Sequence, residues 1–104
     1  DFSESGGILT YNGVGGLFLF SGSIDFSCNK VADITVALSI NGTPATDGLS
    51  IIRSFSSANK RGSASSNGIF QINTGDTFQV ATRGDGTTGT EITVFTLNLT
   101  FTEV

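Results

Sequence analysis

An alternating segment from Leu17 to Phe26 constrains the fold of this chain more than any other feature. It follows a cluster of glycines and reads Leu-Phe-Leu-Phe-Ser-Gly-Ser-Ile-Asp-Phe. Successive side chains of a β-strand point to opposite faces, so a strand here has one face that carries Phe18, Phe20, Ile24 and Phe26. The opposite face carries Ser21, Ser23 and Asp25. The segment therefore predicts a long strand with one buried and one largely solvated face.

Two leucines break this division. Leu17 and Leu19 lie on the otherwise polar face of the same strand. We expect that end of the strand to be covered as well, either by the last strand of the chain or by a neighbouring subunit.

Strand-like segments recur along the whole chain, separated by Gly, Asn and Asp turns at intervals typical of a β-sandwich or jelly roll. Asn41-Gly42 predicts a tight turn, because both residues tolerate a positive φ. Residues 56–67 are rich in Ser, Ala and Gly and predict a long loop or a poorly paired edge strand. The remaining predicted strands are Ile8–Tyr11, Asp33–Ile40, Leu49–Phe55, Gly68–Asn73, Thr77–Arg83 and Glu91–Val104.

The last predicted strand changes phase. Ile92 and Val94 share one parity, whereas Phe95, Leu97, Leu99 and Phe101 share the other. Since a shift of one residue moves every side chain to the opposite face, two arrangements fit. Either a β-bulge near Val94 re-aims the strand, or both of its faces are buried, as at a subunit interface. The bulge is the favoured arrangement.

Length and composition predict a single all-β domain. The 104 residues are expected to form one antiparallel β-sandwich (jelly roll) of seven, eight or more strands over residues 1–104, with residues 1–7 as an N-terminal arm or extension. Only 13% of the residues are charged, whereas 13 are Ser and 14 are Thr. The exposed surface is therefore expected to be neutral and rich in hydroxyl groups.

The residues needed for common catalytic and metal chemistry are scarce. The chain has no histidine, which removes the usual nucleophilic triads and the commonest transition-metal ligand. We predict no enzymatic activity, no catalytic residues, no bound metal and no cofactor. The single cysteine, Cys28, follows Phe26 on the apolar face and is expected to be a small buried residue, with an intermolecular disulfide or a reactive thiol as the alternative.

The formal net charge of −4 argues against binding to nucleic acid, because phosphate contacts need clustered Lys and Arg. There is no apolar run long enough for a membrane span. Most basic residues flank the predicted loops. They solubilise the chain or form a polar recognition surface, for which the candidates are Arg53, Lys60, Arg61, Arg83 and Asp85. The Arg83-Gly84-Asp85 tripeptide is interpreted as a turn.

Several segments in the same order resemble the jelly rolls of the complement globular head and of tumour necrosis factor (TNF). Gly16–Phe20 is similar to the G-x-[YF]-x-F strand of that family, and Ile34–Gly42 resembles its next strand with an Asn-Gly turn. Ile69–Ile72, Gly75-Asp76 and Phe78–Val80 resemble a further pair of strands. The resemblance covers roughly residues 9–104 and departs from the family near the N-terminus.

The hydroxyl-rich surface and the closing segment 93–100 look most like TNF-like domains of bacteriophage structural proteins. The resemblance implies a homotrimer around a threefold axis, with Leu17, Leu19, Phe95, Leu97, Leu99 and Phe101 at the interface. It also implies a capsid decoration or spike at the virion surface that binds the major capsid protein or another virion protein. The alternatives are a receptor- or glycan-binding fibre tip, with recognition through loops 42–48, 56–67 and 84–90, and a secreted TNF-like or complement-like ligand.

Overall fold

The computed structural model describes residues 1–44 and 49–104, and in these residues the chain is all-β. Its strands are β1 (Phe2–Ser5), β2 (Ile8–Tyr11), β3 (Gly16–Cys28), β4 (Ala32–Ile40), β5 (Thr43–Pro44), β6 (Ser50–Phe55), β7 (Arg61–Ile72), β8 (Thr77–Arg83) and β9 (Ile92–Glu103).

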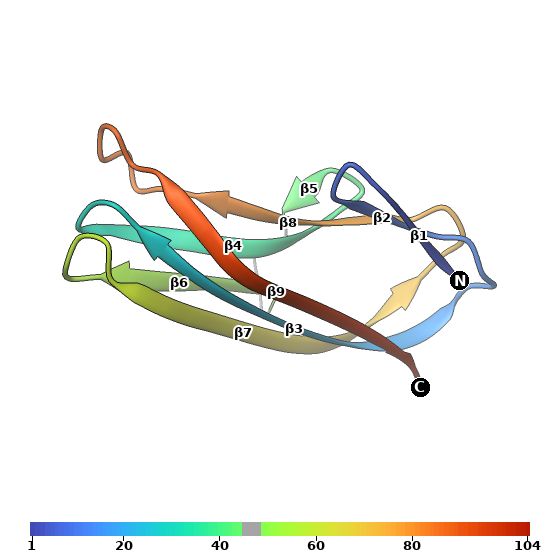
Figure 1. The fold of residues 1–104 in the computed structure, drawn as a ribbon. Helices are drawn as coiled ribbons and strands as arrows, with labels where there is room; N and C mark the ends of the chain where they lie inside the picture. Colours follow the sequence, from blue (N-terminus) through green and yellow to red (C-terminus); the bar gives the residue numbers. More distant parts are fainter. Residues whose placement is uncertain (45–48) are drawn as a thin grey trace.

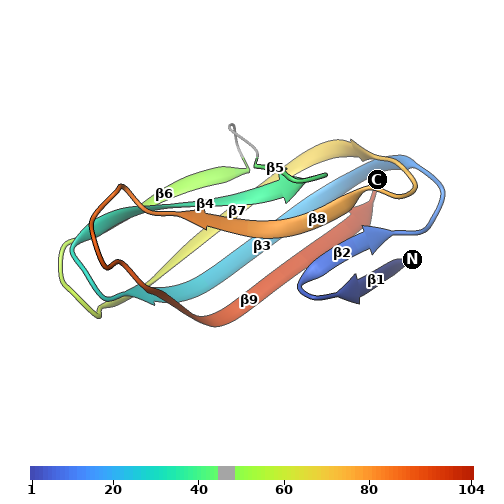
Figure 2. The ribbon, with the colours of Figure 1, turned by 90° about the horizontal axis from the view of Figure 1, so that it is seen from above.

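The strands form two antiparallel sheets that lie face to face (Figures 1 and 2). The smaller sheet has the order β7-β3-β9. The larger sheet has the order β1-β2-β8-β4-β5, and β6 also pairs with β4. Together they give an elongated molecule of 44 × 24 × 21 Å. The all-β class and the antiparallel sheets predicted from the sequence are confirmed.

The core lies between the sheets in two clusters, and β3 contributes to both. Phe18 and Phe20 pack with aromatic and aliphatic residues of β2, β4, β7 and β8 in the first cluster. Ile24, Phe26 and Cys28 pack against Ile34 and Phe55 in the second. The prediction of one apolar face on β3 is confirmed. Cys28 is fully buried, so it cannot meet another thiol while the domain is folded.

The strand boundaries predicted most accurately from the sequence are those next to turn-forming residues. Ile8–Tyr11 and Thr77–Arg83 form strands with the predicted bounds. The Asn41-Gly42 turn is also confirmed, since both residues have positive φ values of 52° and 83°. They allow Ile40 to pair with Thr43, as expected for a two-residue hairpin.

The N-terminal residues, which the sequence predicted to form an arm or extension, include a strand. Phe2–Ser5 is a strand that pairs with β2 along its length. Phe2 explains why: its ring centre lies 5.1 Å from that of Tyr11 and 4.9 Å from that of Phe101. Burial of this ring between two aromatic neighbours holds β1 against the sandwich.

The prediction of a loop or a poorly paired strand over residues 56–67 is wrong for its second half. From Arg61 onward the chain belongs to β7, which is an edge strand but pairs continuously with β3 as far as Ile72. Its inward-facing residues from Gly62 to Gly68 are small because other side chains occupy the space beside them. A side chain at Gly62 would collide with the Arg53 guanidinium, and one at Gly68 would press on Leu49.

A β-bulge explains the phase change of the last strand. Asp25 of β3 pairs with Thr96, but the next residue, Phe26, pairs with Val94, so Phe95 is an additional residue on β9. The bulge keeps Val94 and Leu97 on the inner face on either side of it. Of the two arrangements that fitted the sequence, the bulge is the one observed.

Candidate interaction surfaces

Hydroxyl and amide side chains cover most of the outer face of the smaller sheet. The side chains of β3 in this set point away from the core, because they alternate with buried residues. Those of β7 and β9 pair directly with outward-facing residues of β3 and therefore lie on the same face. The set comprises Ser21, Ser23, Ser63, Ser65, Asn67, Thr96, Asn98, Thr100 and Thr102, and all are exposed.

One end of this outer face is apolar. Leu17 and Leu19 of β3 are 51% and 43% exposed, and Ile69 of β7, which pairs directly with Leu19, is 62% exposed. We call these three residues the outer apolar patch. The register of β7 places Ile69 there, and sequence reasoning missed it because the pairing of β7 with β3 could not be deduced from local pattern. Contiguous apolar surface of this kind is typical of contact sites.

Three of the four predicted interface residues of the last strand, Leu97, Leu99 and Phe101, lie on the other face of the same sheet. Leu97 pairs with the buried Ile24, and Phe101 pairs with the buried Phe20. Leu99 pairs with Gly22 and packs against the first core cluster. The structure therefore separates these residues from Leu17 and Leu19. Because β9 lies beside β3 rather than over it, it does not cover the two leucines, and the first of the two covers expected from the sequence is wrong.

The two lateral edges of the sandwich differ in whether strands of the two sheets contact each other there. On one side β6 contacts β7. On the other side β9 forms the margin of its sheet (Figure 2), and no strand of the described residues pairs with its second edge. Val94 and Leu97 of β9 consequently remain 49% and 46% exposed although they belong to its inner face. We call the unpaired side of β9, with Val94 and Leu97 beside it, the β9 edge.

Phe95 is directed outward by the bulge and meets two charged residues. The guanidinium carbon of Arg61 lies 4.1 Å from the centre of the Phe95 ring. The same guanidinium donates a hydrogen bond from Nε to Asp25 Oδ2 at 2.9 Å, and its Nη2 lies 2.8 Å from the same oxygen in an ion pair. Phe95, predicted for the trimer interface, and Arg61, predicted for a loop surface, thus form one exposed cluster across all three strands of the smaller sheet.

Arg53, a candidate for the recognition surface, lies on β6 within the predicted strand Leu49–Phe55. It is half-buried and stacks over the Phe55 ring at 5.5 Å. Its Nε atom is buried without a hydrogen-bond partner. This guanidinium closes the contact between β6 and β7, where its neighbour is Gly62.

Three connections meet at one end of the molecule, the left end in Figure 1. The amide of Asn59 donates to the carbonyl of Cys28, and the amide of Glu91 donates to Asn29 Oδ1. Lys60, Arg83 and Asp85 lie on or beside these connections, as the sequence predicted. The predicted recognition loop 42–48 falls partly on residues 45–48, which lie outside the described residues.

Asp85 organises the loop between β8 and β9. Its carboxylate accepts hydrogen bonds from the hydroxyl and amide of Thr87, at 2.6 and 3.0 Å, and from the amide of Asp33 at 3.0 Å. The Thr87 hydroxyl and these amides lower the pKa of Asp85 to about 2. The carboxylate is therefore committed to holding the loop, which agrees with the interpretation of Arg83-Gly84-Asp85 as a turn.

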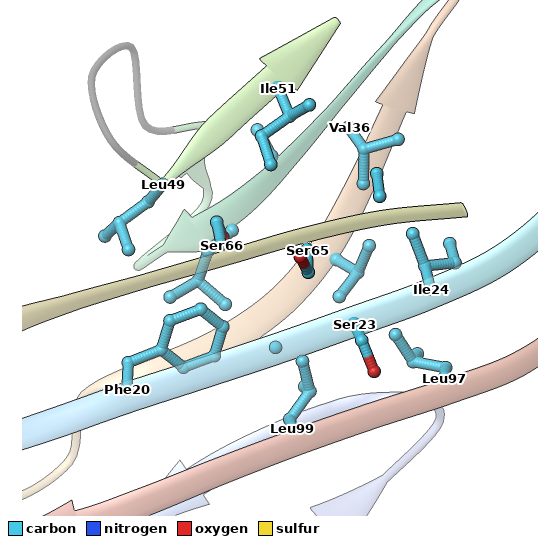
Figure 3. Close-up of a pocket in the computed structure, with 15 residues that line it drawn as sticks. Phe20, Ser23, Ile24, Val36, Leu49, Ile51, Ser65, Ser66, Leu97 and Leu99 are labelled. Carbon is cyan, nitrogen blue, oxygen red and sulfur yellow. The ribbon is translucent and has the colours of Figure 1, made fainter. Parts of the chain in front are cut away.

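A small apolar cavity separates the two core clusters (Figure 3). Its volume is about 30 Å³, and Ile24, Val36, Val80 and Leu97 are among the aliphatic side chains that line it. Gly22 lies on the same wall, where a Cβ atom would come within 2.6 Å of the Phe20 ring. The cavity shows that the sheets are not fully packed near their centre.

In the described residues, no group of three or more His, Cys, Asp or Glu side chains could hold a metal ion. That part of the chain also contains no helix long and apolar enough to cross a membrane. Comparison of the chain with protein-family models, with curated proteins and with solved structures found no match.

Proposed function

We propose that this chain is a non-enzymatic structural module of a bacteriophage virion. In this proposal it is a homotrimeric, TNF-like jelly roll that sits on the virion surface as a capsid decoration or head spike. It binds the major capsid protein or another virion protein and stabilises the shell by mass action, because a ligand that binds only the assembled state favours that state.

The pairing of the strands supports the jelly-roll part of the proposal. Strand β4 pairs with β6, β3 pairs with β7, and β2 pairs with β8. These pairs are nested in the sequence, since each later pair encloses the one before. Nested antiparallel pairs distributed over two sheets are the pattern produced when a long hairpin is rolled up into a jelly roll.

The outer apolar patch is the observation that carries the proposal of self-association. Leu17, Leu19 and Ile69 are adjacent, about half exposed, and surrounded by hydroxyl and amide side chains. Burial of this patch against another copy would remove apolar surface from water without burying a charge. The number of three copies comes from the resemblance of the strand motifs to TNF-like domains.

Sedimentation velocity of the purified chain tests this proposal. A trimer is expected, and Leu19→Asp is expected to abolish the trimer while the chain stays folded, because the substitution would bury a carboxylate in an apolar contact. Ser65→Asp is the matched control, since it adds the same charge to the hydroxyl part of the same face and is expected to leave the trimer intact. A Leu19→Asp protein that remains trimeric would place the interface elsewhere.

A receptor- or glycan-binding tip is the second candidate function. It is favoured by the gathering of Lys60, Arg83 and the ordered loop around Asp85 at one end of the molecule. A rigid sandwich that presents loops at one end is a common arrangement for recognition. This function predicts that the purified chain binds cells or glycans in the absence of any virion protein, whereas the decoration function predicts binding to the shell alone.

A further inference from the structure

Apart from the bulge at Phe95, the β9 edge lacks the features by which natural proteins protect an exposed strand. Edge strands usually carry charges or proline, are very short, or are covered. Strand β9 is twelve residues long, and its residues from Ile92 to Thr102 include no charged residue and no proline. The bulge at Phe95 interrupts it near one end only, so that Thr96–Thr102 is a regular strand.

Apolar side chains beside this edge are also incompletely covered. Leu97 belongs to the inner face, lines the central cavity, and is still 46% exposed. An added strand would supply backbone partners for β9 and would cover Leu97 at the same time. The edge therefore offers both features of a strand-pairing site, which are unpaired backbone N–H and C=O groups and an incompletely covered apolar side chain.

The sequence of the edge indicates which strand fits it. Residues 96–100, which follow the bulge, read Thr-Leu-Asn-Leu-Thr, which is the same in both directions. If two copies pair antiparallel about a twofold axis at Asn98, Thr96 lies opposite Thr100 of the second copy, and Leu97 lies opposite its Leu99. Aliphatic residues then meet on the inner face and hydroxyl residues meet on the outer face, with no charge opposed to another.

We propose that β9 pairs with β9 of a second copy of this chain in this register. The two smaller sheets then form one continuous sheet of six strands, with Asn98 beside Asn98 of the second copy at the axis. This contact goes beyond the proposed function and is independent of it, because it uses the free backbone edge of β9, whereas the outer apolar patch consists of side chains of β3 and β7 on the outer face. If both contacts form, trimers associate in pairs, and the smallest closed assembly has six chains.

Charge substitution at Asn98 tests the register directly. Asn98 is exposed, faces outward and pairs with the neutral Ser23, so Asn98→Lys and Asn98→Asp are expected to fold normally. Both are made in the Leu19→Asp background, which removes the proposed trimer contact. The background protein is expected to be a dimer in sedimentation equilibrium at low salt. Each Asn98 variant alone places like charges at the axis, and its Kd is expected to rise about fivefold or more.

Mixing the two Asn98 variants is the matched control. The introduced lysine of one copy then opposes the introduced aspartate of the other, so the mixed pair is expected to recover at least the original affinity. It should appear as a heterodimer of intermediate mass in native mass spectrometry. A background protein that is monomeric at all concentrations overturns the proposal. So does an affinity that does not depend on the charges introduced at Asn98. The trimer contact is tested by comparing the unmodified chain with Leu19→Asp, and the β9 contact is tested within the Leu19→Asp background. Failure of one contact therefore does not imply failure of the other.

Discussion

The guanidinium of Arg61 lies 4.1 Å from the centre of the Phe95 ring, although the two residues belong to the opposite edge strands of the smaller sheet. The contact spans β3, where Asp25 fixes the same guanidinium with a hydrogen bond and an ion pair. It exists because the bulge turns Phe95 to the outer face, and it therefore ties the bulge to both edges of the sheet.

Removal of this contact is expected to lower stability modestly. Phe95→Ala should reduce the free energy of unfolding by about 0.5–1 kcal/mol through the cation–π interaction at an exposed site. A double-mutant cycle with Arg61→Ala, measured by urea denaturation, separates this coupling from the ion pair with Asp25. Additive effects of the two substitutions would show that the stacked geometry contributes nothing.

The loop held by Asp85 should make stability depend on pH in the acid range. The pKa of Asp85 in the folded protein is about 2, below its ordinary value of 3.8, so the ionised carboxylate favours the folded state. This contribution is complete above the unfolded pKa and is lost as the pH falls from about 4 to about 2. Asp85→Asn should therefore lower Tm clearly at pH 6 and much less at pH 2, where about half of the folded-state carboxylates are protonated. An equal loss of Tm at both pH values would contradict the role of the charge.

The central cavity gives a pair of substitutions with opposite expected effects. Ala64 lines the cavity, so Ala64→Val fills part of it. Filling the whole volume of about 30 Å³ would stabilise the domain by up to ~0.7 kcal/mol, because destabilisation grows with the volume of an empty cavity. Gly22→Ala places a Cβ atom 2.6 Å from the Phe20 ring and should destabilise it by ~1–3 kcal/mol. Chemical denaturation of both variants provides the comparison, and stabilisation by Gly22→Ala would show that Phe20 can move freely.

Cys28 should react with thiol reagents only when the domain opens. Its side chain is fully buried in the second core cluster, out of reach of solvent. In native buffer its labelling rate should be slower by orders of magnitude than in denaturant, and it should rise with urea as the folded population falls. Rapid labelling of the native protein would contradict the packing of β3 against β4 and β6.

The sequence predicted the strands whose inward residues are large. In β3 and β8 the phenylalanines alternate with polar residues, and this pattern was sufficient to place them. Strand β7 was not predicted from Arg61 to Asn67, because its inward positions are small and the space is filled by Arg53 and Leu49 from the other side of the sandwich. That information lies in the tertiary packing and is absent from the local pattern.

The candidate interface could be predicted only in part for a similar reason. Parity alone identified Leu17 and Leu19 as unusual, but the register of β7 was needed to add Ile69. The position of Leu97, Leu99 and Phe101 depended on whether β9 contains a bulge, and the sequence left that open. Once the bulge is placed, these residues form the inner row of the β9 edge and no longer belong with the two leucines.

Native mass spectrometry of the unmodified chain over a range of concentrations tests self-association most directly. The chain has a mass of 10.7 kDa, so a trimer is expected at about 32 kDa (three times 10.7), together with a six-chain species at higher concentration. A protein that remains at the monomer mass at every concentration would contradict the account, because its exposed apolar patch and unprotected edge would then have no partner in copies of the same chain.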